Sequence, residues 1–448
     1  MDHTLELGQE KLGKLFIKYS IPSIIGMLFF SIYIVIDGIF VGQVVGANGL
    51  AAINIAMPFF SIAMAVSIMV SSGANTIVAI ELGQGNIAKA RQTFSLAFYT
   101  LMILSTTVCI LTLVFIEPIC KALGATLELM PMVKRYLAVL CIFTPVFTGS
   151  GLLSGGIRSM GKPTYSMVCT VIGSVLNIIF DYLLVVVWGM GVFGAALASG
   201  LAFMIAFIVG FVAYLPRKST LHFTTCKLDF RKIGRFFYNG SSEALTEVAV
   251  AFSTYIFNII LLMRMGEKGV SAFSIISYVT SLIIAVLLGV ATGIAPITGY
   301  NYGAGHKERV ISLNNLALKV MATLGIICTL GMFIFGKPLI LLFAPGDPEL
   351  IEMTVWATKL YSLAFLVNGI NILGSAYFTA LEDAKTSALI SLLRGIILIF
   401  IGILILPQFL GDAGIWLTVF FSEMLTLLYT RYLFQKSYRH LRQKATHS

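Results

Sequence analysis

The distribution of apolar residues is the feature that most limits what this chain can fold into. Asp37 is the only charged residue between positions 21 and 80, and Asp181 is the only one between 163 and 216. A helix needs about 20 apolar residues to cross a bilayer, so each of these stretches is long enough for two spans. Lipid offers no partners to backbone N–H and C=O groups, which requires the spans to be helical. The sequence therefore predicts an all-α polytopic membrane protein.

The breaks between the apolar runs predict twelve transmembrane helices. The expected spans are 15–42, 50–82, 93–116, 131–156, 163–187, 192–215, 238–264, 270–300, 310–335, 351–380, 386–410 and 412–435. A long polar segment divides them into two sets of six. We therefore expect an N-terminal six-helix lobe (1–215), a cytoplasmic linker (216–237), a C-terminal six-helix lobe (238–435) and a cytoplasmic tail (436–448).

The net charge of +10 is explained by membrane topology and does not indicate a nucleic-acid partner. If both termini lie on one side of the membrane, 21 Lys and Arg residues fall on that side and seven on the other. The positive-inside rule places the more basic side in the cytoplasm. We therefore expect a multi-pass protein of the bacterial inner (cytoplasmic) membrane with both termini in the cytoplasm.

The two halves are related by an internal repeat at an offset of 220 residues. The stretch SSGANTIVAIELGQGNIAKA at 71–90 aligns with ATGIAPITGYNYGAGHKERV at 291–310. Because each half has an even number of helices, the halves share one orientation and are related by an axis along the membrane normal. Two such pseudo-symmetric lobes would meet around a central cavity, and rocking one against the other would open it to each side in turn.

Two acids and two neutral polar residues are predicted to form a cation or proton site in the N-terminal lobe. A charge inside a membrane helix costs about 2.5–3.5 kcal/mol on insertion scales, so it usually faces a partner or a cavity. Helix rise places Asp37, Asp181 and Ser199 at a similar depth, within about 10 Å of the outer helix ends. Asn177 precedes Asp181 by one turn and shares its face. Paired carboxyls in a dry setting can take up a proton or bind a hard cation, although a structural contact between helices is the alternative interpretation.

Two further pairs of charged residues lie within the C-terminal spans. Glu243 and Glu247 share one face of the seventh helix near its cytoplasmic start. They either contact a cationic substrate in the central cleft or are solvated at its mouth. Arg394 and Glu423 lie at similar depths on the eleventh and twelfth helices, which predicts a structural ion pair.

The sequence does not predict an enzyme or an organic cofactor. The five histidines all lie near cytoplasmic helix ends or loops, and no paired metal-binding acids accompany them. GIRSMGK at 156–162 approaches a phosphate-binding loop, but Pro163 replaces the required hydroxyl residue. Without an ATPase domain, transport would draw on an ion gradient. No metal is expected beyond Na⁺ at the candidate coupling site.

Five stretches of this sequence resemble the multidrug and toxic compound extrusion (MATE) family, in particular its bacterial branch of staphylococcal multidrug exporters. These are YIVIDGIFVG at 33–42, the repeat stretch at 71–90, GIRSMGKPTYSM at 156–167, VLNIIFDYLLV at 175–185 and GVFGAALAS at 191–199. The resemblance covers nearly the whole chain. It implies twelve helices in two lobes and secondary active export of amphipathic, often cationic, organic compounds by antiport against H⁺ or Na⁺.

The resemblance also implies residue roles. Family members similar at these motifs couple ions at the positions of Asp37, Asn177, Asp181 and Ser199, the last replacing the commoner Thr but keeping a hydroxyl. Some branches carry an acid in the tenth helix, where this chain has Asn368 and Asn371 instead. The expected coupling site is therefore in the N-terminal lobe. The expected partners are small organic molecules and the lipid bilayer, and the expected oligomeric state is a monomer.

Two other functions are compatible with this architecture. A flippase for a lipid-linked precursor would need a strongly cationic central cavity, whereas the N-terminal spans supply acids. A membrane-embedded transferase would need catalytic groups that the spans lack. The acids therefore favour export of cationic cargo.

Overall fold

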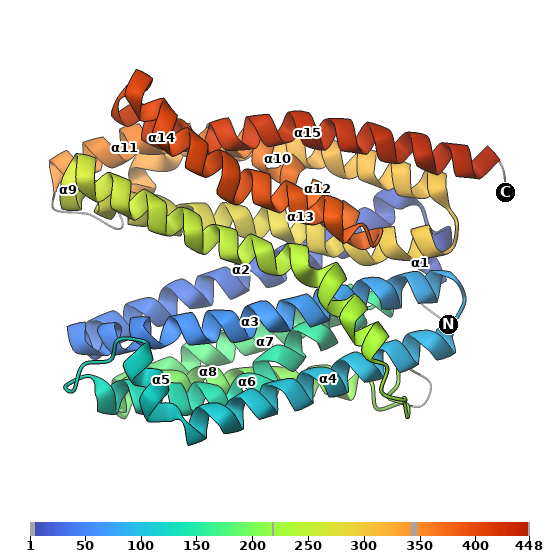
Figure 1. Cartoon of the computed structure of the whole chain (residues 1–448), viewed down its shortest axis with the longest axis horizontal. Coiled ribbons are helices and arrows are strands. Elements are labelled where there is room, and N and C mark those ends of the chain that lie inside the picture. Colours follow the sequence, from blue (N-terminus) through green and yellow to red (C-terminus); the bar gives the residue numbers. More distant parts are fainter. Residues whose placement is uncertain (1–4, 217–218, 342–346, 447–448) are drawn as a thin grey trace.

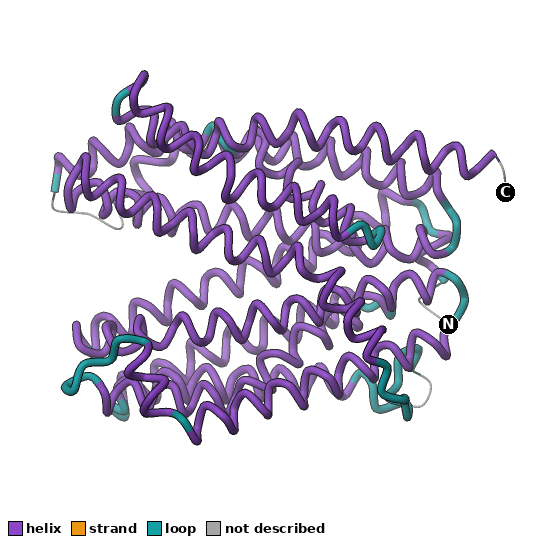
Figure 2. The backbone as a smooth tube through the Cα atoms, in the orientation of Figure 1, coloured by secondary structure: helices purple, strands orange, loops and turns teal. Residues whose placement is uncertain are grey.

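The computed structural model describes residues 5–216, 219–341 and 347–446, and the regular elements within them are all helices (Figures 1 and 2). The N-terminal half contains α1 (Glu6–Gln9), α2 (Leu12–Val44), α3 (Gly46–Gly83), α4 (Ile87–Val114), α5 (Ile116–Ala122), α6 (Met130–Ser159), α7 (Pro163–Asp181), the π-helix η1 (Tyr182–Val187) and α8 (Gly191–Val212). The C-terminal half contains α9 (Phe230–Gly303), α10 (Lys307–Leu341), α11 (Pro348–Ser362), α12 (Phe365–Ala380), α13 (Ala384–Leu392), the π-helix η2 (Leu393–Ile397), α14 (Leu398–Leu410) and α15 (Asp412–Thr446).

These elements make the twelve predicted spans. Ten helices in the described part of the chain are long and apolar enough to cross a membrane. One of them, α9, has 74 residues and is two spans joined at Gly266, whose φ of 66° is a conformation that glycine adopts readily. The pair α11 and α12, bent by 49° at a short break, supplies the remaining span.

The segment between the two halves is shorter than the predicted linker. α8 ends at Val212 and α9 already begins at Phe230, where the Asp229 side chain caps it by accepting a hydrogen bond from Lys232 N. At the other terminus, α15 continues as a helix into the predicted tail, as far as Thr446. Positions 217–218 of the predicted linker and 447–448 of the predicted tail lie outside the described residues.

Both termini lie at one end of the helical bundle, called the termini end below (Figure 1). There, a single buried apolar cluster takes residues from both lobes, such as Tyr19 and Ile77 from the N-terminal half and Ile297 and Met321 from the C-terminal half. Toward the opposite end the lobes diverge (Figure 1), and the large clusters there each belong to one lobe. The lobes are therefore joined at the termini end.

Candidate coupling and substrate sites

The four residues predicted to form a coupling site lie together in the N-terminal lobe, toward the opposite end. Asp37 is on α2, Asn177 and Asp181 are on α7, and Ser199 is on α8. Asn177 Nδ2 donates a hydrogen bond to Ser199 Oγ at 2.9 Å, and the carboxyl groups of Asp37 and Asp181 are close neighbours. Asn177 and Asp181 are both 0% exposed. Three helices thus bring together two carboxyls, an amide and a hydroxyl, of which Asn177 and Asp181 are buried and Asp37 and Ser199 are half-buried.

The oxygens of this group lack donors. Among the described residues, no N–H or O–H donates to either carboxyl oxygen of Asp181, to Asp37 Oδ1 or to Asn177 Oδ1. No described Lys, Arg or His forms an ion pair with Asp37 or Asp181. Two ionised carboxylates only accept hydrogen bonds, so they can bond each other only when one is protonated. A bound proton or cation would supply the positive charge that these oxygens lack.

Two tyrosines that the sequence analysis did not single out lie close to the carboxyl pair. Tyr33 precedes Asp37 by one turn of α2, and Tyr136 comes from α6; both are in electrostatic range of the two acids. Tyr33 also packs edge-on against Phe203 of α8, with ring centroids 5.6 Å apart. The spacing of Tyr33 could have revealed it from sequence, whereas Tyr136 reaches the site only through tertiary packing.

A π-helix begins directly after Asp181. η1 covers Tyr182–Val187, and the related eleventh span of the C-terminal lobe holds the second π-helix, η2, which includes Arg394. π-Helical turns are rare and occur frequently at functional sites. Each lobe thus places one beside a charged side chain of a membrane-spanning helix.

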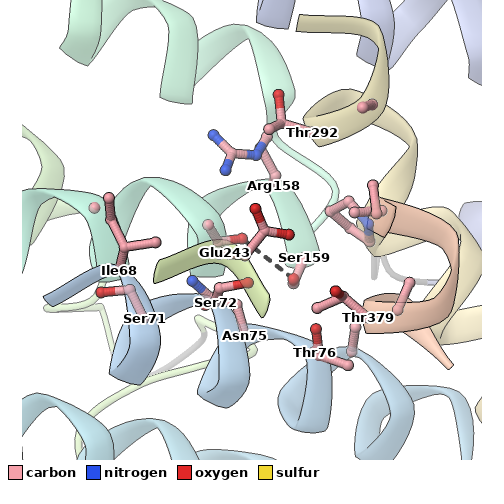
Figure 3. Close-up of a pocket in the computed structure, with 18 residues that line it drawn as sticks. Ile68, Ser71, Ser72, Asn75, Thr76, Arg158, Ser159, Glu243, Thr292 and Thr379 are labelled. Carbon is pink, nitrogen blue, oxygen red and sulfur yellow. Dashed lines mark hydrogen bonds between the residues drawn. The ribbon is translucent and has the colours of Figure 1, made fainter. Parts of the chain in front are cut away.

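A cavity of about 280 Å³ lies between the lobes, lined by α3 and α6 on one side and by α9 and α12 on the other (Figure 3). Glu243, one of the two acids predicted to contact substrate, lines it and interacts with Thr379. Glu247 lies one turn further along α9, is exposed, and is not among the lining residues. Glu243 and Glu247 remain electrostatic neighbours, but only Glu243 lines the cavity.

Arg158 brings a positive charge to the same cavity (Figure 3). Its Nη1 donates hydrogen bonds to Ser154 Oγ at 2.9 Å and Ser166 Oγ at 3.1 Å. No ion pair joins Arg158 to a described acid. Arg158 has no predicted role in substrate binding, because its position on the wall of an inter-lobe cavity depends on the fold.

The C-terminal lobe contains a buried charged centre of a different kind. Arg394 Nη2 lies 2.7 Å from Glu423 Oε1, so the two residues predicted as an ion pair are in direct contact. Asn368 Nδ2 donates to Glu423 Oε1 at 2.8 Å, and Asn371 Nδ2 donates to Oε2 at 2.7 Å. Glu423 therefore has both a counter-charge and donors on each oxygen.

Known protein families and solved structures match this chain in sequence and in fold. The family model MatE matches the chain twice, over residues 22–183 and 244–404. The chain belongs to the MATE family of multidrug transporters. One match falls in each lobe, in agreement with the internal repeat. The MATE resemblance found in the sequence and the predicted twelve-helix fold are confirmed.

Individual MATE proteins are similar along nearly the whole chain. Multidrug export protein MepA of Staphylococcus aureus (strain MSSA476) is 24% identical over 418 residues, which cover 93% of this chain and 92% of that protein. A MATE structure in complex with MaL6 superposes with a TM-score of 0.93 at 21% identity, covering 98% of this chain and 99% of that one. A multidrug resistance MATE family transporter in its outward-facing conformation gives a TM-score of 0.92 at 21% identity and covers 98% of both chains.

Proposed function

We propose that this chain is a secondary active exporter that moves amphipathic, often cationic, organic compounds out of a bacterial cell by antiport against H⁺ or Na⁺. The coupling ion binds at Asp37 and Asp181, with Asn177 and Ser199 beside them. The termini face the cytoplasm, as the positive-inside rule favours. The contrast between the buried acids of the two lobes supports this assignment best.

The buried acids differ in what surrounds them. Glu423 has a counter-charge from Arg394 and hydrogen-bond donors on both oxygens. Asp181 has neither within the described residues. Leaving buried acceptors unpaired costs about 1–3 kcal/mol each, and more when they are charged. A bound H⁺ or Na⁺ removes that cost at the N-terminal pair, whereas the C-terminal centre needs no ion.

The arrangement of the lobes supports alternating access by rocking. In this structure the lobes join at the termini end and diverge at the opposite end, toward which Asp37 and Asp181 lie. Opening that end exposes the pair to the external ion, and closing it carries the ion inward. One charge entering across 100 mV supplies about 2.3 kcal/mol, enough to sustain a gradient of about 50-fold for an uncharged substrate. Exchange of one monovalent cation for one ion moves no net charge and draws on the ion's concentration gradient alone.

The inter-lobe cavity supports an amphipathic cationic substrate. Glu243 supplies a carboxylate that can pair with an ammonium group, and the neighbouring alanines and Pro296 supply apolar surface. A ligand bound between the two lobes contacts both, so their relative motion changes its surroundings. Binding there therefore links substrate occupancy to the rocking motion.

Efflux of a fluorescent organic cation from vesicles tests the proposal, with a proton or a sodium gradient imposed separately. The wild type is compared with Asp37→Asn and Asp181→Asn, and with Glu267→Gln as a control at an exposed acid. We expect one gradient to drive wild-type and control efflux and neither to drive the two Asn variants. Wild-type efflux that ignores both gradients would reject antiport and favour the flippase function.

A further inference from the structure

Two sets of side-chain contacts, called grips below, join the lobes at the termini end. The first grip is an ion pair. Glu81, near the end of α3, is 3% exposed and accepts a hydrogen bond from Thr93 of α4. Its Oε1 lies 3.3 Å from the Nζ of Lys232, in the first turn of α9, and 3.8 Å from that of Lys89. Because α9 begins the C-terminal lobe, this ion pair holds the start of one lobe against the other.

The second grip is formed by hydrogen bonds that the C-terminal lobe donates to the first residues of the N-terminal lobe. Asn301, near the end of α9, is 0% exposed, and its Nδ2 donates to the Leu7 carbonyl at 2.9 Å. Arg309 of α10 donates to Asn301 Oδ1 at 3.0 Å and to the Glu10 carbonyl at 2.8 Å. Leu7 and Glu10 belong to the segment that leads into α2. Here the C-terminal lobe holds the start of the N-terminal lobe.

The internal repeat relates the two grips. At the offset of 220, Glu81 aligns with Asn301 and Lys89 aligns with Arg309. Each lobe thus uses equivalent positions to hold the segment that precedes the first span of the other lobe. The chemistry differs, since one grip depends on an ion pair and the other on amide and guanidinium hydrogen bonds to backbone carbonyls.

Close backbone contacts lie beside the grips and follow the same symmetry. A Cβ added at Gly83 would collide with the Tyr300 carbonyl, and one added at Gly303 would collide with the Ile80 carbonyl. Gly83 aligns with Gly303, and Ile80 aligns with Tyr300, at the offset of 220. The crossing of α3 with the second span of α9 therefore lies on the pseudo-twofold axis, in the closed end of the structure.

We propose that the Glu81–Lys232 ion pair and the Asn301–Leu7 hydrogen bond, supported by Lys89 and Arg309, are paired latches that hold the termini end closed and set the balance between the two open states. Opening this end separates α3 from α9 and the α1 segment from α10, so both latches must break. The latches act whichever ion drives transport, so they do not depend on the coupling site assigned above.

A distance measurement across the termini end tests the proposal. Spin labels are attached at Gln92→Cys on α4 and Lys385→Cys on α13, both exposed positions, in full-length protein whose six native cysteines are replaced. Pulsed electron paramagnetic resonance in lipid nanodiscs then reports the fraction of molecules with this end open. We expect Lys232→Met and Asn301→Ala to raise the ratio of open to closed molecules by about tenfold each.

The chain offers a matched control for each latch. Arg235 lies one turn after Lys232 and forms a 2.6 Å ion pair with Glu382, but both partners are in the C-terminal lobe. Asn314, also buried, donates to the Tyr438 hydroxyl at 2.7 Å within that same lobe. We expect Arg235→Met and Asn314→Ala to leave the ratio unchanged, and Lys232→Arg to retain the wild-type ratio.

Thermal unfolding of each variant shows which of them are folded, so that the ratios are compared only among folded proteins. If a latch variant does not fold, Glu81→Gln replaces Lys232→Met and Arg309→Met replaces Asn301→Ala. Folded latch variants with the wild-type ratio would overturn the proposal. An equal shift in the two control variants would overturn it as well, because any lost polar contact would then act alike.

Discussion

The carboxyl groups of Asp37 and Asp181 are close neighbours on two helices of the N-terminal lobe, and no described side chain gives either of them a counter-charge. A pair in this state needs a proton or a cation to be stable in an apolar setting. In the antiport proposed above, the occupancy of this site would differ between the two sides of the membrane.

Ser199 should support coupling by holding Asn177 in place. Ser199→Ala removes the acceptor at 2.9 Å from Asn177 Nδ2, and a net hydrogen bond contributes about 1 kcal/mol. We expect gradient-driven efflux to fall about fivefold in Ser199→Ala and to remain at the wild-type rate in Ser199→Thr. Equal rates in the two variants would show that the hydroxyl has no role. Efflux from vesicles measures both.

Glu243 should contribute to the binding of cationic substrates. Its carboxylate lines the inter-lobe cavity, whereas Glu247 is exposed outside it. We expect Glu243→Gln to raise the KM for a monovalent organic cation about tenfold, which corresponds to about 1.4 kcal/mol, and to leave the KM for a neutral substrate unchanged. Glu247→Gln serves as the control and should change neither. A larger effect at Glu247 than at Glu243 would place the substrate elsewhere.

Arg394 should stabilise the fold without taking part in ion coupling. Arg394→Met leaves Glu423 buried without a counter-charge, which costs about 3–5 kcal/mol. We expect a marked fall in the thermal unfolding midpoint in detergent, and its recovery in the double variant Arg394→Met with Glu423→Gln. The double variant should also keep gradient-driven efflux. Loss of coupling in a stable double variant would mean that the C-terminal centre participates in transport.

Gly303 should be required for closure of the termini end. Gly303→Ala places a Cβ against the Ile80 carbonyl, so α3 and α9 can no longer approach as closely. We expect the labelled distance across this end to shift toward the open state by about tenfold or more. Gly331→Ala is the control, because a Cβ at Gly331 meets no atom within 4 Å. A closed end in Gly303→Ala would show that the helices can adjust.

Most of the fold follows from the sequence because lipid imposes simple requirements on length and hydrophobicity. The twelve spans were predictable for this reason, and so was the division into two lobes. The break between Ser362 and Phe365 was not, since the residues between them are Leu363 and Ala364, which disrupt no helix locally. The start of α9 at Phe230 was not predicted either. The basic residues Arg231, Lys232 and Arg235 are typical of a solvated linker, but here they lie in the first turns of a helix.

The residues of the candidate site were predictable to a smaller extent. Asp37 and Asp181 stand out as isolated charges in apolar runs, and helix spacing connects Asn177 with Asp181. Tyr136, Arg158 and Glu81 gave no comparable signal. Their positions depend on packing between helices or between lobes, which an apolar pattern within one helix does not record.

In an antiporter the ion and the substrate cross in opposite directions, so the ion carried inward must leave before the substrate is carried outward. The ion proposed at the Asp37–Asp181 pair is therefore expected to leave when substrate binds. Release of protons or Na⁺ on addition of substrate to the purified protein tests this claim most directly, with a pH indicator in weak buffer and a sodium electrode. We predict that the wild type and Glu267→Gln release about one ion per molecule on binding a cationic substrate, and that Asp181→Asn binds the substrate but releases none. Release from Asp181→Asn equal to that of the wild type would contradict the claim and place the coupling ion elsewhere.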